Sequence, residues 1–540
     1  MSTTRRRATT WLALAGLTGA VAITGATATA SATGTSAAAE LPVYGVRSAG
    51  LTPDQAAALQ RAFGLEDVHL AEDGSVSFAD EATYLHVPGL DRGAGKPDED
   101  GSETTLTSLD VDALSRLRAI PVEDATGKAL ETLRGAGLLP ANATPTAAHT
   151  TFEVVGADTK PVLSAPLDTA VSFAFTLDGV PLEGPGAKLR VAFDGQGAVS
   201  GLTYSTREVV EVGRVPVLTL DEGRERCAKV LGASVRPTGV SYVYEAPPLS
   251  EKVDRLDPGF RCDGVNSDGA AVQAVIVGAA VDARLPQPGP VDPPREEGSL
   301  APQWTNRIDV GSEGTGPCSG LPWTANNLST FNNRFTAAGV PVQFSWVNHN
   351  AWERDFKDPV FPGGQDHLYA DDVDMTYWQG HGSPTGFSFA GCSSNTDTFL
   401  SKDEARWGNK DVEWMSLFTC SILQASSGGQ SWAARWGKAF RGLHQINSFD
   451  TVSYHSAVHG GKFANYLVRQ PFLWWNKPMK VRDAWAQASI DTQPASVRWA
   501  TMGPIGGGGL ANFDDYFWNK GPVGPDTLPT GGYWRISGTS

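Results

Sequence analysis

The sequence predicts an α/β protein: its C-terminal half is expected to form a mostly parallel sheet with helices on both faces, preceded by an α+β region. Two observations support the parallel sheet. The run Asp411–Thr419 is apolar on both faces, as are strands buried inside parallel sheets. Predicted helices separate this run from the other predicted strands, and that alternation is typical of parallel strands joined by crossover helices.

The C-terminal elements follow in order from local patterns. The first helix is amphipathic and ends at Gly339, a residue that commonly stops helices. The remaining strands are short and rich in β-branched and aromatic residues. The expected helices are Asn327–Ala338, Trp432–Arg441, Lys462–Val468 and Val481–Ile490, and the expected strands besides Asp411–Thr419 are Val340–Val347, Val373–Gln379 and His444–Val452.

The N-terminal half reads as helices followed by strands. Thr52 and Pro53 begin a helix that runs to Phe63, and Gly64 ends it. Asp-Gly pairs favour tight hairpin turns between the strands. The other expected helices are Leu109–Ile120, Glu123–Arg134 and Asp221–Leu231, and the expected strands are Ala170–Leu177, Lys188–Phe193 and Ala198–Tyr204.

Composition divides the chain into four parts. Residues 1–32 are interpreted as a signal peptide, because three arginines precede an apolar run that ends in small residues suited to cleavage. Residues 41–283 form the α+β pro- or accessory region, and 304–540 form the α/β domain. Between them, 284–303 is a proline-rich linker, whose Arg284 and Arg295 are expected to be exposed and accessible to a maturation protease. Every tryptophan except Trp11 lies beyond this linker.

Charge and composition exclude some function classes. A hydrophobic fraction of 41% is enough for packed cores, so global disorder is not expected. A net charge of −16 argues against nucleic acid and anionic membranes as partners. No run after the leader is long and apolar enough to span a bilayer, so the mature protein is expected to be soluble and extracellular.

Five cysteines in an exported chain are first interpreted as disulfide partners. Pairing within each half gives Cys227–Cys262 as one bridge, and counting alone does not say which cysteine of the C-terminal half is free. Cys318 and Cys392 lie in loop-like sequence, where crosslinks are tolerated, whereas Cys420 ends a buried strand. We therefore predict a Cys318–Cys392 disulfide and a free Cys420 thiol.

Two of the predicted strands end in groups that can react together. His381 follows one strand between two glycines, and Cys420 directly follows the next long apolar run. An imidazole can take the thiol proton, which makes the sulfur nucleophilic, and can later protonate a leaving amine. The backbone amides of Gly382 and Cys420 are candidates for stabilising an oxyanion. The alternative interpretation is structural, with His381 capping a strand end and Cys420 packing in the core.

The sequence gives less support to metal-dependent, serine-hydrolase or phosphate-binding chemistry. No zinc-peptidase, serine-hydrolase or phosphate-loop motif occurs, and His455 with His459 has metal-ligand spacing without a glutamate beside it, so no metal or cofactor is expected. Acidic residues near the motifs are interpreted mainly as solvated loop charges, with a basic-residue pocket or calcium binding as alternatives. They are Asp371, Asp372, Asp374, Asp411 and Glu413.

The order of these motifs resembles the caspase–legumain–gingipain group of cysteine peptidases. The segment His381-Gly382-Ser383, followed by Gly386, is similar to the His-Gly-Ser segment of legumains and gingipains. The resemblance implies a caspase-like fold, with His381 as general base and Cys420 as nucleophile. After its cysteine the chain has Ser421-Ile422-Leu423, where legumain has Glu-Ser-Gly. More weakly, residues 178–195 resemble propeptide modules of exported peptidases.

The function that we predict is a secreted, cysteine-dependent peptide hydrolase that acts on peptide or protein substrates through a His-Cys dyad. Two alternatives stay open: a catalytically silent relative that binds peptide or protein, and an extracellular wall- or glycan-binding protein. The sequence leaves open the substrate, the activity of the dyad, removal of the N-terminal region, calcium binding, the export route and the oligomeric state.

Overall fold

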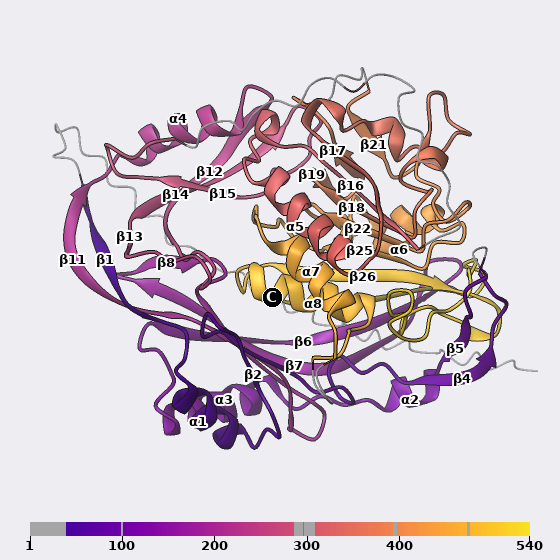
Figure 1. The fold of residues 1–540 in the computed structure, drawn as a ribbon, viewed down its shortest axis with the longest axis horizontal. Helices are drawn as coiled ribbons and strands as arrows, with labels where there is room; N and C mark the ends of the chain where they lie inside the picture. The colour runs from indigo at the N-terminus through magenta and orange to yellow at the C-terminus, as the bar shows by residue number, and fades with distance from the viewer. Residues whose placement is uncertain (1–38, 99–100, 286–294, 296–307, 393–396, 472–475) are drawn as a thin grey trace, which may run out of the picture. The chain divides into compact units, whose positions relative to one another are not determined.

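The centre of the C-terminal half is a short parallel array (Figure 1). Each of its strands pairs in parallel with the next. In spatial order the strands are β17 (Val342–Val347), β16 (Val310–Gly314), β18 (Met375–Gln379), β22 (Trp414–Phe418) and β25 (Gln445–Phe449). The computed structural model describes residues 39–98, 101–285, 295, 308–392, 397–471 and 476–540, all within the compact unit Ala38–Ser540. The predicted signal peptide 1–32 and most of the linker 284–303 lie outside the described residues.

Beyond β25 the sheet becomes antiparallel and continues into the N-terminal half. The strand β26 (Arg498–Ile505) pairs antiparallel with β25, and β27 (Gly532–Thr539) pairs with β26. On its other side β27 pairs antiparallel with β6 (Ala143–Gly156). One sheet therefore joins the regions 41–283 and 304–540.

The N-terminal strands of this sheet are also mostly antiparallel. The strand β6 pairs with β7, and β7 pairs with both β8 and β9. On one branch β9 pairs with β10, β10 with β3, and β3 with β2. On the other branch β8 pairs in parallel with β12, and β12 and β14 then pair antiparallel with β14 and β15, respectively. The bounds are β7 (Pro161–Leu177), β8 (Val180–Glu183), β9 (Lys188–Phe193), β10 (Val199–Ser205), β3 (Val76–Ala79), β2 (His69–Leu70), β12 (Val235–Glu245), β14 (Pro258–Asn266) and β15 (Val275–Gly278).

The remaining strands form small sheets. Their bounds are β1 (Glu40–Ala49), β11 (Arg207–Pro216) and β13 (Arg255–Leu256) in one; β19 (His381–Ser383), β20 (Gly386–Ser388) and β21 (Phe399–Ser401) in another; and the pairs β4 (Gly89–Ala94) with β5 (Thr105–Leu109) and β23 (Ser426–Ser427) with β24 (Gln430–Ser431). The β19–β20 hairpin is the one that matters for the site, because it begins at His381.

The prediction of a mostly parallel sheet with helices on both faces, the caspase-like arrangement, is wrong. Apolar runs identify buried strands but not their partners, and the last strands β26 and β27 return as an antiparallel pair that the N-terminal strands extend. The helices also gather on one face: α5 (Thr324–Ala337) packs on α7 (His459–Val468), and α7 packs on α8 (Val481–Thr492). The other face of the parallel array is covered by irregular segments and the short α6 (Trp432–Trp436).

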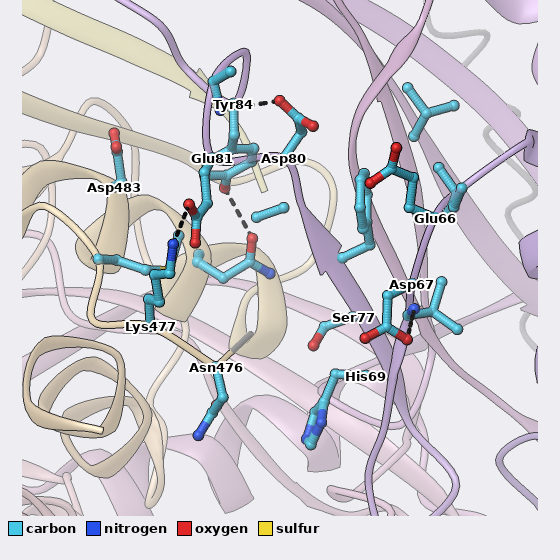
Figure 2. Close-up of a pocket in the computed structure, with 18 of the residues that line it drawn as sticks. Glu66, Asp67, His69, Ser77, Asp80, Glu81, Tyr84, Asn476, Lys477 and Asp483 are labelled. Carbon is cyan, nitrogen blue, oxygen red and sulfur yellow. Dashed lines mark hydrogen bonds and ion pairs between the residues drawn. The ribbon is translucent and has the colours of Figure 1, made fainter. Parts of the chain in front are cut away.

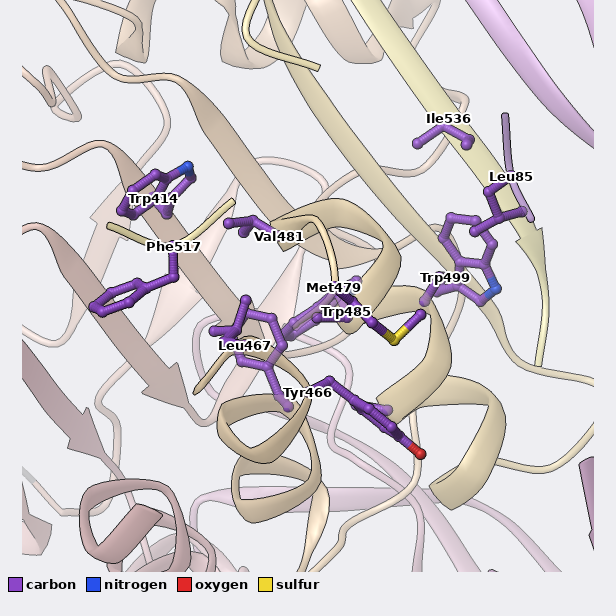
Figure 3. Close-up of a cluster of buried hydrophobic side chains, with 14 of the residues drawn as sticks. Leu85, Trp414, Tyr466, Leu467, Met479, Val481, Trp485, Trp499, Phe517 and Ile536 are labelled. Atoms are coloured by element: carbon purple, nitrogen blue, oxygen red, sulfur yellow. The ribbon is translucent and has the colours of Figure 1, made fainter. Parts of the chain in front are cut away.

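Alternation along the strands produces the two faces. Tyr377 of β18 and Phe418 of β22 point toward the helix-covered face, where they join Phe463 of α7 and Trp485 of α8. Figure 3 shows the part of this cluster around Trp485, with Leu85 from the N-terminal half also in it. The other face holds Trp378 and its neighbours. Both halves of the chain thus share one core.

Local signals at several helix ends agree with the structure. The helix α1 (Pro53–Phe63) begins with a capping box at Thr52 and ends at Gly64 in the left-handed conformation. The predicted helix Trp432–Arg441 is shorter, because α6 gives way to a 3₁₀ turn at Gly437–Ala439. The other helices are α2 (Val111–Arg116), α3 (Val122–Gly135) and α4 (Leu220–Leu231).

The structure contains the disulfides Cys227–Cys262 and Cys318–Cys392, and Cys420 is free and buried. These are the pairs that the cysteine pattern predicted. Within the part of the chain that the structure describes, no helix combines the length and apolarity needed to cross a bilayer.

Candidate functional site

His381 and Cys420 lie at equivalent points on one edge of the sheet. The strands β18 and β22 pair in parallel with Gln379 opposite Phe418, so both strands end at the same level. His381 follows Gln379 after one glycine, and Cys420 follows Phe418 after one threonine. The residue after Cys420, Ser421, has φ 58°, a left-handed conformation that is uncommon for a residue other than glycine and often occurs at functional sites.

The His381 ring is buried and both of its nitrogens have partners. Nε2 lies 2.7 Å from the carbonyl oxygen of Ser319, and Nδ1 lies 3.3 Å from the backbone nitrogen of Gln273. Because a carbonyl can only accept, Nε2 carries the proton, and Nδ1 accepts from Gln273. Burial lowers the pKa of His381 to about 4, although the Ser319 carbonyl opposes this shift. The imidazole is therefore neutral at pH 7.

The Cys420 thiol is also buried and neutral. Its Sγ lies 3.8 Å from Oγ and 4.0 Å from the carbonyl oxygen of Ser453. Burial raises the pKa of the Cys420 thiol to about 11, although the Ser453 contacts oppose this rise. Among the described residues no hydrogen bond joins His381 to Cys420. In this state the structure brings the two groups to one edge of the sheet without forming a reactive dyad.

A segment from the N-terminal half, Ala271–Ala274, lies across this edge. Ala271 forms an antiparallel bridge with Gly382, and Ala274 forms a parallel bridge with Tyr454. Between them Gln273 is completely buried. Because these bridges flank the positions of His381 and Cys420, the segment covers the site from the outside.

The Gln273 side chain connects the histidine side of the site to the cysteine side. Its Nε2 donates to the carbonyl oxygen of Phe418 at 3.0 Å and to Ser453 Oγ at 3.1 Å, and its Oε1 lies 3.4 Å from Gln379 Nε2. Its backbone N–H occupies the His381 nitrogen that would take the thiol proton. The sequence did not predict a role for Gln273, because no motif surrounds it and its partners lie more than a hundred residues away.

Gly382 is a site where only glycine fits. A Cβ there would lie 2.4 Å from Thr419 Oγ1 and 3.1 Å from the carbonyl oxygen of Cys420. The Thr419 hydroxyl is itself buried, with no hydrogen-bond partner among the described residues. Gly382 thus allows the His381 and Cys420 strand ends to approach closely. The oxyanion role of the Gly382 and Cys420 amides stays a prediction.

The two histidines with metal-ligand spacing are engaged with the protein. His455 accepts a hydrogen bond from the backbone N–H of Trp323 at 2.7 Å, and its other nitrogen lies 2.9 Å from Gln379 Nε2. His459 lies 3.1 Å from the Tyr377 hydroxyl and stacks on the Phe418 ring, with the centroids 4.2 Å apart. His455 therefore belongs to the polar network behind His381, whereas His459 is a core residue.

The interpretation of the acidic residues as solvated loop charges is wrong for most of them. Asp371, Asp372, Asp374 and Glu413 are buried. Asp374 and Glu413 directly precede β18 and β22, at the edge opposite His381 and Cys420, so they cannot form a specificity pocket beside the dyad. One carboxylate oxygen of Asp374 lies within 4.8 Å of a carboxylate oxygen of Asp309 and of one of Asp411.

A large cavity of about 1130 Å³ lies elsewhere (Figure 2). It is bordered by α1, β3 and the segment that precedes α8, and neither His381 nor Cys420 lines it. Figure 2 shows mixed charges at its wall, including the Lys477–Glu81 ion pair at 2.8 Å. This mixture of charges does not favour one class of ligand.

Comparisons with known proteins find one family model that is similar to part of the chain. Residues 307–538 match the model described as "Domain of unknown function (DUF6345)". No curated protein matches the chain. An uncharacterized protein from Eubacterium rectale is similar over 46% of this chain and 87% of its own, at 10% identity and a TM-score of 0.26. The C-terminal domain of YpeB from Bacillus megaterium is similar over 43% and 94%, at 13% identity and a TM-score of 0.19.

Proposed function

We propose that the chain is a latent, exported, cysteine-dependent peptide hydrolase in which His381 is the base, Cys420 is the nucleophile and Gln273 keeps the two apart. The observation that carries the proposal is the contact of Gln273 with Nδ1 of His381 and with Ser453, which touches the Cys420 thiol. A packing histidine and cysteine need no such connector. The two disulfides support an oxidising, extracellular location.

The chemistry requires Gln273 to withdraw. His381 Nδ1 can then take the proton of the Cys420 thiol, while the Ser319 carbonyl holds the Nε2 proton. The thiolate attacks a peptide carbonyl, and the proton on Nδ1 passes to the amine as the carbon–nitrogen bond breaks. Water attacks the resulting thioester, gives a proton back through His381, and releases the acid and the thiol. The resemblance of the His-Gly-Ser segment to cysteine peptidases supports these roles.

A second candidate is a protein that binds peptide at this edge without chemistry. The pKa values favour it in the present state, since burial lowers the pKa of His381 to about 4 and raises that of Cys420 to about 11. Both groups are therefore in the unreactive form at neutral pH. The two candidates differ in what happens when the site opens and water enters, because water would move both pKa values back toward ordinary values.

The test is to weaken the connector and follow the thiol. We expect Gln273→Ala to raise the rate of Cys420 alkylation by iodoacetamide at least tenfold, because it removes three buried side-chain hydrogen bonds of about 1 kcal/mol each. The backbone N–H of residue 273 stays, so the substitution acts by loosening the segment Ala271–Ala274 and not by removing the contact with His381. Hydrolysis of a fluorogenic peptide library should rise in parallel and vanish in Gln273→Ala/Cys420→Ala. The matched control is Gln487→Ala, which removes another buried glutamine, whose hydrogen-bond partners are Thr203, Asp491 and Tyr84.

Two outcomes separate the candidates. Faster alkylation without hydrolysis of any library peptide would favour the binding protein. If Gln273→Ala alkylates no faster than Gln487→Ala, the connector role is contradicted, and His381 and Cys420 are then packing residues.

A further inference from the structure

Arg295 is buried, although the proline-rich linker predicted an exposed side chain. Only 3% of its side chain is accessible. Its guanidinium carbon lies over the rings of Trp346, Trp352 and Tyr369, at 4.5, 4.1 and 4.3 Å from their centroids. Each such contact attracts a cation through the electron-rich ring face, and desolvation strengthens it. Three of them around one guanidinium make an aromatic cage.

A carboxylate completes the cage. Asp355 faces the guanidinium with both oxygens: Arg295 Nη1 lies 2.5 Å from Oδ2, and Nη2 lies 3.4 Å from Oδ1. The Asp355 side chain is fully buried. This two-pronged geometry suits the planar fork of arginine and not the single ammonium of lysine.

The cage also contacts the backbone of the residue that it holds. The Arg295 N–H donates to Asn350 Oδ1 at 2.5 Å, and Nη1 donates to the Asn350 carbonyl oxygen at 3.3 Å. A structural ion pair needs only the side chain, whereas contacts to both the amide and the guanidinium recognise an arginine within a peptide.

A second acid lies beside the first. Glu313, at the end of β16, accepts a hydrogen bond from the backbone N–H of Trp352 at 2.6 Å. Burial, and next the nearby Asp355, raises the pKa of Glu313 well above its ordinary value. Burial also raises the pKa of Asp355 to about 6, although Arg295 opposes that shift. Burial thus disfavours a negative charge on either carboxyl group, and the Arg295 guanidinium offsets that cost at Asp355.

Every wall of the cage comes from residues 313–369, and its occupant comes from the linker. The walls belong to β16, to β17 and to the turns Asn348–Asn350 and Glu353–Asp355, with Tyr369 directly after the turn Asp366–Leu368. The site is thus built by one part of the chain and filled by another, which is the arrangement of a binding site with a resident ligand.

We propose that Glu313, Trp346, Asn350, Trp352, Asp355 and Tyr369, the Arg295 cage, form a binding site for an arginine residue of a peptide, filled here by the chain's own Arg295. The strand β17 pairs with β16, and β16 pairs with β18, which leads to His381. Substrate selection by the cage rests on the proposed function. If that function holds, the cage selects arginine-containing substrates, and Arg295 must leave before such a substrate can bind.

The test uses the full chain with the resident arginine removed. We expect Arg295→Ala to bind N-acetyl-argininamide saturably, with a change in tryptophan fluorescence, and to bind N-acetyl-lysinamide about tenfold more weakly or not at all. Wild type should not respond, because its cage is filled. Adding Asp355→Asn to Arg295→Ala should weaken argininamide binding about tenfold or more. Arg284→Ala, which removes the exposed linker arginine, is the matched control and should behave as wild type.

Each contrary result overturns the cage. No saturable binding to Arg295→Ala, equal binding of the lysine and arginine amides, or an Arg295→Ala chain that does not fold would mean that Arg295 is a permanent structural residue. Binding is measured without catalysis, so the two proposals can fail separately. Arginine binding without Cys420-dependent hydrolysis would support the cage and contradict the hydrolase. Hydrolysis with no preference for arginine would support the hydrolase and contradict the cage.

Discussion

The two edges of the parallel array differ in the groups that surround their buried histidines. At the N-terminal edge an ionisable group directly precedes each of four strands: Asp309 before β16, Asp374 before β18, Glu413 before β22 and His444 before β25. At the C-terminal edge, where His381 and Cys420 lie, the partners are the neutral Gln273 and Ser453. His444 at the first edge thus has a buried carboxylate partner, Asp515, whereas His381 and Cys420 at the second edge contact neutral groups. We call the surroundings of His444 the charged edge and those of His381 and Cys420 the neutral edge.

Two buried histidines show what this difference does. Burial lowers the pKa of His381 to about 4, and within the part of the chain that the structure describes no carboxylate opposes this shift. Burial would also lower the pKa of His444, but the ionised Asp515, whose Oδ2 lies 2.7 Å from Nδ1, raises it to about 9. The same residue type is therefore neutral at one edge and charged at the other. Burial alone does not set the charge of a group; the partner decides it.

The largest expected effect comes from breaking the charged edge. His444→Ala leaves Asp515 buried without its cation, and we expect the free energy of unfolding to fall by about 3–5 kcal/mol. Chemical denaturation at pH 7 measures the loss. The matched variant is His381→Ala at the neutral edge, which leaves no buried charge and should cost clearly less. Equal losses in the two variants would contradict the comparison.

The next effect comes from the disulfide of the neutral edge. Cys318–Cys392 closes a loop with a sequence separation of 74 and adjoins Ser319, the acceptor for His381. Replacing both cysteines with serine should lower the free energy of unfolding by about 2–4 kcal/mol. It should also speed Cys420 alkylation in the native state, because His381 loses a fixed partner. Replacing Cys227 and Cys262, which lie in α4 and β14, should destabilise the chain without changing that rate.

The sequence predicted local elements better than their partners. Capping residues identified α1 at both ends, and apolar runs located the strand ends that carry His381 and Cys420, because both signals depend on neighbouring residues. The pairing of β27 with β6 and the contact of Gln273 with His381 depend on tertiary packing across long stretches of chain. No local pattern encodes such contacts. The spacing of the residues that form the aromatic cage around Arg295 likewise predicts no binding site.

The pH dependence of stability should separate the two histidines. The pKa of His444 is raised to about 9 from 6.5, so its contribution is fully present below pH 6.5 and is lost as pH rises through 9. The pKa of His381 is lowered to about 4 from 6.5, so the folded chain loses stability as pH falls from 6.5 toward 4. The free energy of unfolding, measured by denaturation at a series of pH values, should fall less steeply above pH 6.5 in His444→Gln than in wild type. In His381→Gln it should fall less steeply between pH 6.5 and 4. A less steep fall between pH 6.5 and 4 in His444→Gln would contradict the assignment.

The smallest stability effect is expected at the thiol itself. Cys420→Ala removes one buried sulfur that makes only weak contacts with Ser453, so the free energy of unfolding should fall by about 1–2 kcal/mol if the thiol is a packing residue. A catalytic thiol that is held for chemistry contributes less to packing, and its loss should leave the melting temperature within a few degrees. It should also abolish alkylation, and abolish hydrolysis in the Gln273→Ala background. Calorimetry and iodoacetamide labelling on the same samples measure both. If Cys420→Ala melts several degrees lower and Gln273→Ala is inert to iodoacetamide, Cys420 is a core residue. The neutral edge would then differ from the charged edge in stability alone and not in function.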